Sequence, residues 1–165
     1  MKKINLAITG CMGRMGQQLI KSANKDKAFK ITSLTESRRI NKRIFGVSPE
    51  INSIDAFKKA NVIIDFTVPK CTLQILRIAV KQKKRVVIGT TGFSEKEEKL
   101  IKNLSRKIPI LKAGNMSLGV NLLMYLTEIA SKSLSTDFLS KVYEVHHKHK
   151  IDHPSGTALM LAKGI

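Results

Sequence analysis

Short apolar runs alternate with segments of helical spacing along most of the chain. The apolar runs predict buried strands at residues 3–9, 29–36, 61–67, 85–89 and 108–111. The segments between them predict helices at residues 17–25, 53–60, 71–82 and 95–107. Ser94 and Glu97 have the spacing of a capping box at the start of the last of these helices. Strands that alternate with helices favour a parallel sheet covered on both faces, so we expect an α/β fold, a Rossmann-type doubly wound parallel sheet.

The pattern changes in the last third of the chain. Residues 118–134 predict a long apolar helix, residues 138–147 predict an extended strand, and a final helix begins near Thr157. One helix, one strand and part of another helix cannot easily close a core of their own. We interpret residues 1–115 as one domain and residues 116–165 as the beginning of an α+β domain that is incomplete in this chain.

Charge and composition narrow the choice of partners. The 165 residues carry a formal net charge of +18, which suits anionic ligands. Aromatic residues make up only 5% and tryptophan is absent, so we expect no nucleic-acid partner, and we interpret most lysines as a solvated surface. No apolar run approaches the ~20 residues of a membrane span, and the apolar stretch after Lys3 is too short for a signal peptide. We expect a cytoplasmic protein with no membrane partner.

Three glycines, Gly10, Gly13 and Gly16, have the spacing G-x-x-G-x-x-G between a predicted strand and a predicted helix. Such glycines permit a tight turn, the close approach of a pyrophosphate, and close packing of helix on strand. Glu36 lies about 20 residues after Gly16, where an acid would hold the ribose hydroxyls. Met12 replaces the second glycine of the usual fingerprint, and a purely structural turn is the alternative. We favour a dinucleotide site.

Neighbouring segments add detail to this site. Arg38 and Arg39 follow the acid and could pair with a 2′-phosphate, so both NADPH and NADH stay open as cofactors. The segments at residues 89–93 and 113–116 follow later predicted strands. In a doubly wound sheet such loops line the ligand crevice, so both are candidates for the nicotinamide side.

The two cysteines, Cys11 and Cys71, have no motif spacing and suggest no disulfide framework. Cys11 lies in the glycine loop at a predicted helix start, a position that favours a lowered thiol pKa. A small loop cysteine without a special role is the alternative interpretation.

The segment EVHHKHK concentrates bases near the end of the chain. If it is extended, Glu144, His146 and Lys150 share one face. A fixed cation beside His146 would make its proton easier to give up, as a general acid requires. His147 and His149 fall on the other face and could chelate a metal, but the lysines and the lack of other ligands oppose this. We expect no metal, and a solvated basic loop is a further alternative.

A Pro-Ser-Gly-Thr turn begins at Pro154. Ser155 or Thr157 can cap the following helix, and Gly156 lets a ligand reach backbone N–H groups. A helix start of this kind binds carboxylate or phosphate. Together with a proton donor and a nicotinamide, it predicts hydride and proton transfer to a small acid.

Five motifs match one known family in order and spacing: GCMGRMG, IDFT, IGTTGF, GNMSLGVN and EVHHKHKIDHPSGTA. They resemble the 4-hydroxy-tetrahydrodipicolinate reductase (dihydrodipicolinate reductase) family of bacterial lysine and diaminopimelate biosynthesis. The resemblance covers the whole chain, and the last motif is highly specific. It implies reduction, with NADPH or NADH, of a cyclic imine dicarboxylate derived from aspartate semialdehyde and pyruvate.

The resemblance also implies roles for individual residues. His146 resembles the catalytic proton donor, and Lys150 resembles its cationic partner. The residues that resemble substrate binders are His147, Ser155, Gly156 and Thr157. The residues expected at the cofactor are Gly10, Cys11, Met12, Gly13, Arg14, Met15, Glu36, Arg38, Gly89, Thr90, Thr91, Ala113, Gly114, Asn115 and Met116. The first predicted domain is then dinucleotide-binding, and the second begins the substrate-binding and oligomerisation domain.

The sequence departs from the family pattern at a few points. His153 stands where relatives usually have alanine, and Met116 stands where they usually have phenylalanine. Neither change removes a catalytic group. Family members continue well past the position of Ile165 and usually form homotetramers through the sheet that follows. We therefore expect this chain to be an N-terminal part, and a non-catalytic dinucleotide-binding fragment is the alternative to an active enzyme.

Overall fold

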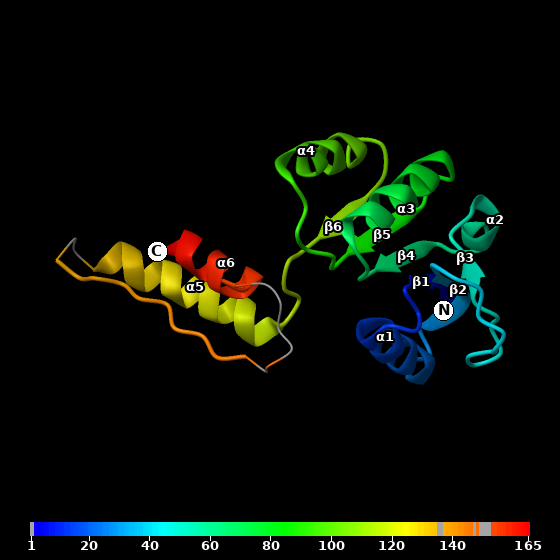
Figure 1. The fold of residues 1–165 in the computed structure, drawn as a ribbon, viewed down its shortest axis with the longest axis horizontal. Helices are drawn as coiled ribbons and strands as arrows, with labels where there is room; N and C mark the ends of the chain where they lie inside the picture. Colours follow the sequence, from blue (N-terminus) through cyan, green and yellow to red (C-terminus); the bar gives the residue numbers. More distant parts are fainter. Residues whose placement is uncertain (1, 135–136, 147, 149–152) are drawn as a thin grey trace. The chain divides into compact units, whose positions relative to one another are not determined.

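The computed structural model describes residues 2–134, 137–146, 148 and 153–165. The chain divides into two compact units, Met1–Ala113 and Gly114–Ile165, which Figure 1 colours along the sequence. All strands found among the described residues lie in the first unit, and the regular structure described in the second unit is helical.

The first unit is built on a six-stranded sheet with the strand order β3-β2-β1-β4-β5-β6, in which every neighbouring pair is parallel. The strands are β1 (Ile4–Thr9), β2 (Phe29–Glu36), β3 (Glu50–Ile51), β4 (Val62–Asp65), β5 (Arg85–Ile88) and β6 (Ile110–Lys112). The helices are α1 (Arg14–Lys25), α2 (Ile54–Phe57), α3 (Pro69–Lys81) and α4 (Glu95–Leu104). The order reverses between β1 and β4, as in doubly wound sheets, and this confirms the predicted Rossmann-type fold.

Two hydrophobic clusters cover the two faces of this sheet. Successive residues of a strand point to opposite faces, and in β1 Ala7 belongs to one cluster while Ile8 belongs to the other. Ile75 of α3 and Ile101 of α4 pack with Ala7, whereas Ile20 of α1 packs with Ile8. Figure 1 shows α3 and α4 on one side of the sheet and α1 on the other. Burial on both faces explains why the strands are continuous apolar runs.

Capping residues set the helix boundaries of this unit. The Ser94 hydroxyl accepts the N–H of Glu97 at 3.4 Å, and the Glu97 carboxylate accepts the N–H of Ser94 at 2.8 Å, so the predicted capping box is confirmed. The helix predicted at residues 53–60 is shorter, because α2 begins after the Ser53 cap and ends at Phe57. The sequence does not predict β3, whose two residues are both exposed and pair only with the end of β2.

The second unit contains α5 (Leu118–Ser133) and α6 (Gly156–Gly164), which contact each other. The predicted long helix is confirmed, and Ser117 caps its start by accepting the N–H of Val120. The extended run predicted at residues 138–147 joins no strand ladder over its described part, residues 138–146, and residue 147 lies outside the described residues.

Candidate functional site

The glycine loop joins β1 to α1 and is shaped by its own backbone. Gly10 has a φ of +58°, a left-handed value that strains residues with a side chain. A Cβ on Gly16 would lie 2.1 Å from the carbonyl oxygen of Gly10, so only glycine lets α1 approach the end of β1 this closely. Gly13 donates its N–H to the same carbonyl at 3.0 Å. Gly10 and Gly16 therefore have the turn and helix-packing roles that the spacing predicts, and the approach of a pyrophosphate to the loop stays a prediction.

The first turn of α1 offers backbone N–H groups to an anion. Its N-cap is Gly13, which supplies no side-chain cap. Among the residues that the structure describes, no acceptor is found for the N–H groups of Arg14 and Met15. Uncapped N–H groups at a helix N-terminus attract phosphate, and the Arg14 side chain adds a cation in the same turn. This turn therefore suits the pyrophosphate of a dinucleotide.

Glu36, the predicted ribose-binding acid, lies against the glycine loop. Its Oε1 accepts the N–H of Met12 at 3.0 Å, and its Oε2 accepts the N–H of Ser37 at 2.9 Å. The end of β2 and the loop after β1 are thus tied together by one carboxylate. An acid at the end of the second strand of a doubly wound sheet commonly accepts hydrogen bonds from the ribose hydroxyls of a dinucleotide, and Glu36 has this position.

A buried carboxylate lies at the carboxyl ends of β1, β4 and β5, beside the point where the strand order reverses. Asp65 is fully buried and accepts hydrogen bonds from four threonine hydroxyls. Thr9 and Thr67 donate to Oδ1 at 2.6 and 2.7 Å, while Thr72 and Thr90 donate to Oδ2, the latter at 3.2 Å. We call these four threonines around Asp65 the threonine cage. A buried charge is costly unless it is hydrogen-bonded, and the cage meets that need.

Two predicted cofactor residues, Gly89 and Thr90, contact the Asp65 region and are held in place by it. The Thr90 hydroxyl donates to Asp65 and also accepts the N–H of Thr67 at 3.0 Å, so its side chain is used inside the protein. Gly89 donates its N–H to the Asp65 carbonyl at 2.9 Å, and a Cβ on Gly89 would lie 2.0 Å from the Phe66 ring. Both residues support the sheet edge. A ligand would meet them through backbone atoms.

The other predicted cofactor residues are more open. The exposed ones in the first unit are Met12, Gly13, Arg14, Met15, Arg38 and Thr91. Ala113 donates its N–H to Ile88 at 3.1 Å, directly after β6. Gly114, Asn115 and Met116 belong to the second unit, where the Asn115 amide donates to the Thr157 hydroxyl at 3.2 Å. Asn115 and Thr157 are therefore two predicted site residues that the structure brings together.

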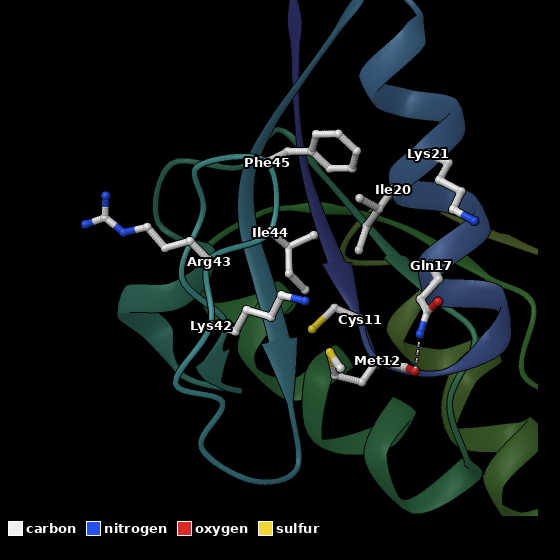
Figure 2. A pocket seen from close by; sticks show the side chains of 9 residues that line it. All are labelled: Cys11, Met12, Gln17, Ile20, Lys21, Lys42, Arg43, Ile44 and Phe45. Atoms are coloured by element: carbon white, nitrogen blue, oxygen red, sulfur yellow. Dashed lines mark hydrogen bonds between the residues drawn. The ribbon is translucent and has the colours of Figure 1, made fainter.

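A cavity of about 360 Å³ adjoins the glycine loop on the α1 side of the sheet. Figure 2 shows the side chains that line it: Cys11, Met12, Gln17, Ile20, Lys21, Lys42, Arg43, Ile44 and Phe45. Lys21 comes from α1 and Lys42 from the segment after β2, while the Arg43 side chain points away from the cavity. The lining contains no acidic side chain. The sequence reasoning missed Lys21 and Lys42, because only the fold brings the two segments together.

Cys11 corrects one prediction. Its thiol is fully buried and packs with Ile20 and Leu34 rather than facing the free N–H groups of α1. Burial, together with the nearby Glu36 carboxylate, raises the pKa of Cys11 to about 11. The predicted lowering of this pKa is therefore wrong, because the side chain turns into the hydrophobic cluster.

In the second unit, Glu144 links the histidine segment to the start of α6. Its Oε1 accepts the N–H of Ser155 at 2.8 Å, and its Oε2 lies 3.5 Å from Nδ1 of His146. The Ser155 hydroxyl accepts the N–H of Ala158 at 3.0 Å, so Ser155 is the N-cap of α6. The predicted proton donor and the predicted anion-binding turn are thus joined through one carboxylate.

The first turn of α6 resembles that of α1 in its open N–H groups. No acceptor is found among the described residues for the N–H groups of Gly156 and Thr157. These are two of the predicted substrate binders. His147 and Lys150, predicted at the same site, lie outside the described residues.

Within the described ranges, no three histidine, cysteine, aspartate or glutamate side chains are grouped to hold a metal ion. The alternative metal site at His147 and His149 lies outside those ranges. None of the helices described is long and apolar enough to cross a membrane.

Comparison with known protein families gives matches along nearly the whole chain. The family model described as "Dihydrodipicolinate reductase, N-terminus" matches residues 4–116, and the model "Dihydrodipicolinate reductase, C-terminus" matches residues 119–165. The chain is 72% identical over 165 residues to 4-hydroxy-tetrahydrodipicolinate reductase of Pelagibacter ubique, covering 100% of this chain and 64% of the relative. It is 42% identical over 178 residues to the enzyme of the same name from Buchnera aphidicola subsp. Schizaphis graminum, covering 99% of this chain and 64% of the relative. The chain thus spans slightly less than two thirds of the length of these relatives.

Solved structures show the same fold. A dipicolinate-bound dihydrodipicolinate reductase from Paenisporosarcina sp. TG-14 superposes with a TM-score of 0.77 at 24% identity, covering 99% of this chain and 65% of that chain. GenD2 from gentamicin A biosynthesis, in complex with NAD, gives a TM-score of 0.62 at 12% identity, covering 77% of this chain and 39% of that chain. At these identities the similarity is one of fold.

Proposed function

Because this chain belongs to the dihydrodipicolinate reductase family, we propose that it carries the dinucleotide-binding part and the beginning of the substrate-binding part of a 4-hydroxy-tetrahydrodipicolinate reductase. The proposed reaction is the NADPH- or NADH-dependent reduction of 4-hydroxy-tetrahydrodipicolinate to tetrahydrodipicolinate, in lysine and diaminopimelate biosynthesis. The observation that carries the proposal is the glycine loop with Glu36 bound to the N–H of Met12, at the carboxyl edge of a doubly wound sheet.

The dinucleotide would bind along the carboxyl edge of the first unit. The open N–H groups at the start of α1 suit its pyrophosphate, and Glu36 suits the adenosine ribose. The predicted nicotinamide side comprises Gly89, Thr90, Thr91 and residues 113–116. When bound, the reduced nicotinamide supplies a hydride. The protein's own task is to hold the dinucleotide in place, and the threonine cage keeps the strand ends in register for it.

The substrate would bind at the second unit through its carboxylates. The open N–H groups of Gly156 and Thr157 are suited to one carboxylate, with the helix N-terminus favouring its negative charge. By family resemblance we assign His147 to the same anionic substrate, His146 as the group that donates a proton, and Lys150 as the cationic partner of His146. In the reaction as proposed, the substrate loses its 4-hydroxyl as water to give a conjugated cyclic imine, and this imine takes up a hydride from the cofactor and a proton from the protein.

A substitution at His146 tests the catalytic assignment. Consumption of NADPH should be followed by absorbance with enzymatically generated substrate, using the chain itself. His146→Gln should lower kcat by about 10²-fold or more, because general acid catalysis contributes at least that much. His153→Gln, a change at an exposed histidine of the same segment, is the matched control and should leave kcat within about twofold. Equal rates for wild type and His146→Gln would refute the role of His146.

A non-catalytic dinucleotide-binding fragment is the second candidate. It rests on the glycine loop and Glu36 alone and assigns no proton donor. Titration of NADH and NADPH fluorescence separates the two candidates. Binding without turnover supports the fragment, binding with turnover supports the enzyme, and no binding of either dinucleotide rejects both.

A further inference from the structure

Glu144 contacts two groups that the proposed function places in different roles. One carboxylate oxygen accepts the N–H of Ser155 at 2.8 Å, at the start of α6. The other lies 3.5 Å from Nδ1 of His146, in a pair whose side chains are 25% and 35% exposed. The pair is therefore partly shielded from water, where a carboxylate–imidazole contact is stronger than on an open surface.

Glu144 lies beside Nδ1 of His146, and this affects which ring nitrogen can give a proton to a substrate. A neutral histidine carries its proton on one of its two ring nitrogens, and the partners of these nitrogens decide which one. A carboxylate can only accept, so the negative charge of Glu144, 3.5 Å from Nδ1, favours the ring form that carries its proton on Nδ1. Nε2 is then the nitrogen that is left to exchange a proton with another molecule.

We propose that Glu144 is the positioning residue for His146, holding the imidazole through Nδ1 and directing Nε2 to the substrate. This inference rests on the proposed function, in which His146 is the proton donor. It adds a residue that the sequence reasoning gave no role beyond a shared strand face.

The proton balance of the step is simple. The imidazolium of His146 carries N–H bonds at both nitrogens. Loss of the 4-hydroxyl as water first converts the substrate into a conjugated cyclic imine. As this imine accepts a hydride, the Nε2–H bond of His146 breaks, its electron pair stays on Nε2, and the proton forms a bond to the imine-derived carbon skeleton, which gives tetrahydrodipicolinate. The product imidazole is the neutral Nδ1–H form, which Glu144 stabilises, and solvent then returns a proton to Nε2.

The second contact links this donor to the substrate end of the site. By accepting the Ser155 N–H, Glu144 fixes the distance between the histidine segment and the first turn of α6. The next two N–H groups of that turn, from Gly156 and Thr157, are those proposed to hold a substrate carboxylate. One side chain thus orients the donor and ties it to the anion-binding turn.

The tautomer of His146 can be measured without substrate or cofactor. Two-bond ¹H–¹⁵N correlation spectra of the whole chain, labelled in histidine, distinguish Nδ1–H from Nε2–H rings at a pH where they are neutral, and His146→Gln assigns the signal. We expect the Nδ1–H form in wild type and a shift toward the Nε2–H form in Glu144→Gln. Glu128→Gln is the matched control, since Glu128 pairs with Lys132 on α5, and it should leave the signal unchanged.

Turnover provides the second readout. Glu144→Gln should lower kcat by about tenfold or more, whereas Glu144→Asp, which keeps the charge, should recover part of the loss. An Nε2–H ring in wild type, or the same tautomer in folded wild type and Glu144→Gln, overturns the positioning role. If Glu144→Gln does not fold, the wild-type tautomer and Glu144→Asp decide the question. If Glu144→Gln changes the tautomer of His146 but neither wild type nor any variant shows turnover, the positioning role stands and the proposed reaction is rejected.

Discussion

Replacing Asp65 with asparagine removes the charge at the centre of the threonine cage and nearly preserves its shape. Four hydroxyls donate to this fully buried carboxylate. A hydrogen bond to a charged group contributes about 1.5–3 kcal/mol and a neutral one about 0.5–1.5 kcal/mol, so each of the four bonds loses about 1 kcal/mol. Thr72 and Thr90 must also rotate their hydroxyls to accept from the new amide. We expect a loss of about 2–4 kcal/mol in the free energy of unfolding.

Urea unfolding followed by far-UV circular dichroism measures this loss. Asp55→Asn is the matched control, because Asp55 is exposed in the first turn of α2, and it should cost less than about 1 kcal/mol. The cage also supports the ends of β1, β4 and β5, so Asp65→Asn should weaken NADH binding even at urea-free, fully folded conditions. If the two variants unfold within about 0.5 kcal/mol of each other, the stabilising role assigned to the cage is refuted.

Three further predictions concern the glycine loop and its cavity. Gly16→Ala places a Cβ 2.1 Å from a backbone oxygen and should lower the free energy of unfolding, measured in urea, by about 3 kcal/mol or more. Gly13→Ala places its Cβ 3.3 Å from the same oxygen and should lower it clearly less. Similar losses for the two variants would contradict the close packing at Gly16. Lys42→Ala removes one of the two lysines that line the cavity beside Met12. A 2′-phosphate that entered this cavity would pair with Lys42, so the substitution should raise the Kd of NADPH by about tenfold with little change for NADH in a fluorescence titration. Equal losses for the two dinucleotides would contradict this pairing. Burial raises the pKa of Cys11 from 9.0 to about 11, so in Cys71→Ser the remaining thiol should react about 10²-fold more slowly in native than in urea-unfolded chain at neutral pH. The Cys11 thiol loses its proton at lower pH in the unfolded chain than in the folded chain, so the free energy of unfolding should fall as the pH rises from 9.0 to about 11. The same pH dependence of unfolding in wild type and Cys11→Ser would contradict the raised pKa.

The glycine loop could be predicted because local rules fix it. A strand, three spaced glycines and a helix determine the turn, and the length of one strand–helix–strand unit brings Glu36 to the loop. The same reasoning failed for Cys11, because spacing places its backbone at the helix start but does not determine the direction of its side chain. Loop position was predictable from sequence, and side-chain direction was not.

The threonine cage could not be predicted because Thr9 and Thr90 come from segments far from Asp65 in the chain, although Thr67 and Thr72 follow Asp65 closely. Thr9, Thr67, Thr72 and Thr90 meet only when β1, β4 and β5 take their parallel register. One signal was present in the sequence: Asp65 is an acid at the end of an otherwise apolar strand, and a buried acid needs donors. The link from Glu144 to Ser155 was hidden in the same way, since sequence spacing does not show that residues 11 positions apart are in contact.

The two hydrogen bonds of Glu36 have a consequence for the thermodynamics of ligand capture. With Met12 and Ser37 each donating to one of its oxygens, the carboxylate has a fixed direction, and the loop that it holds has a fixed shape. A ribose that binds here would meet acceptors that need no reorientation, so this loop loses little conformational entropy when the dinucleotide binds. Calorimetry of dinucleotide binding should therefore show a smaller entropic penalty for wild type than for Glu36→Ala, in which the loop must be ordered by the ligand itself.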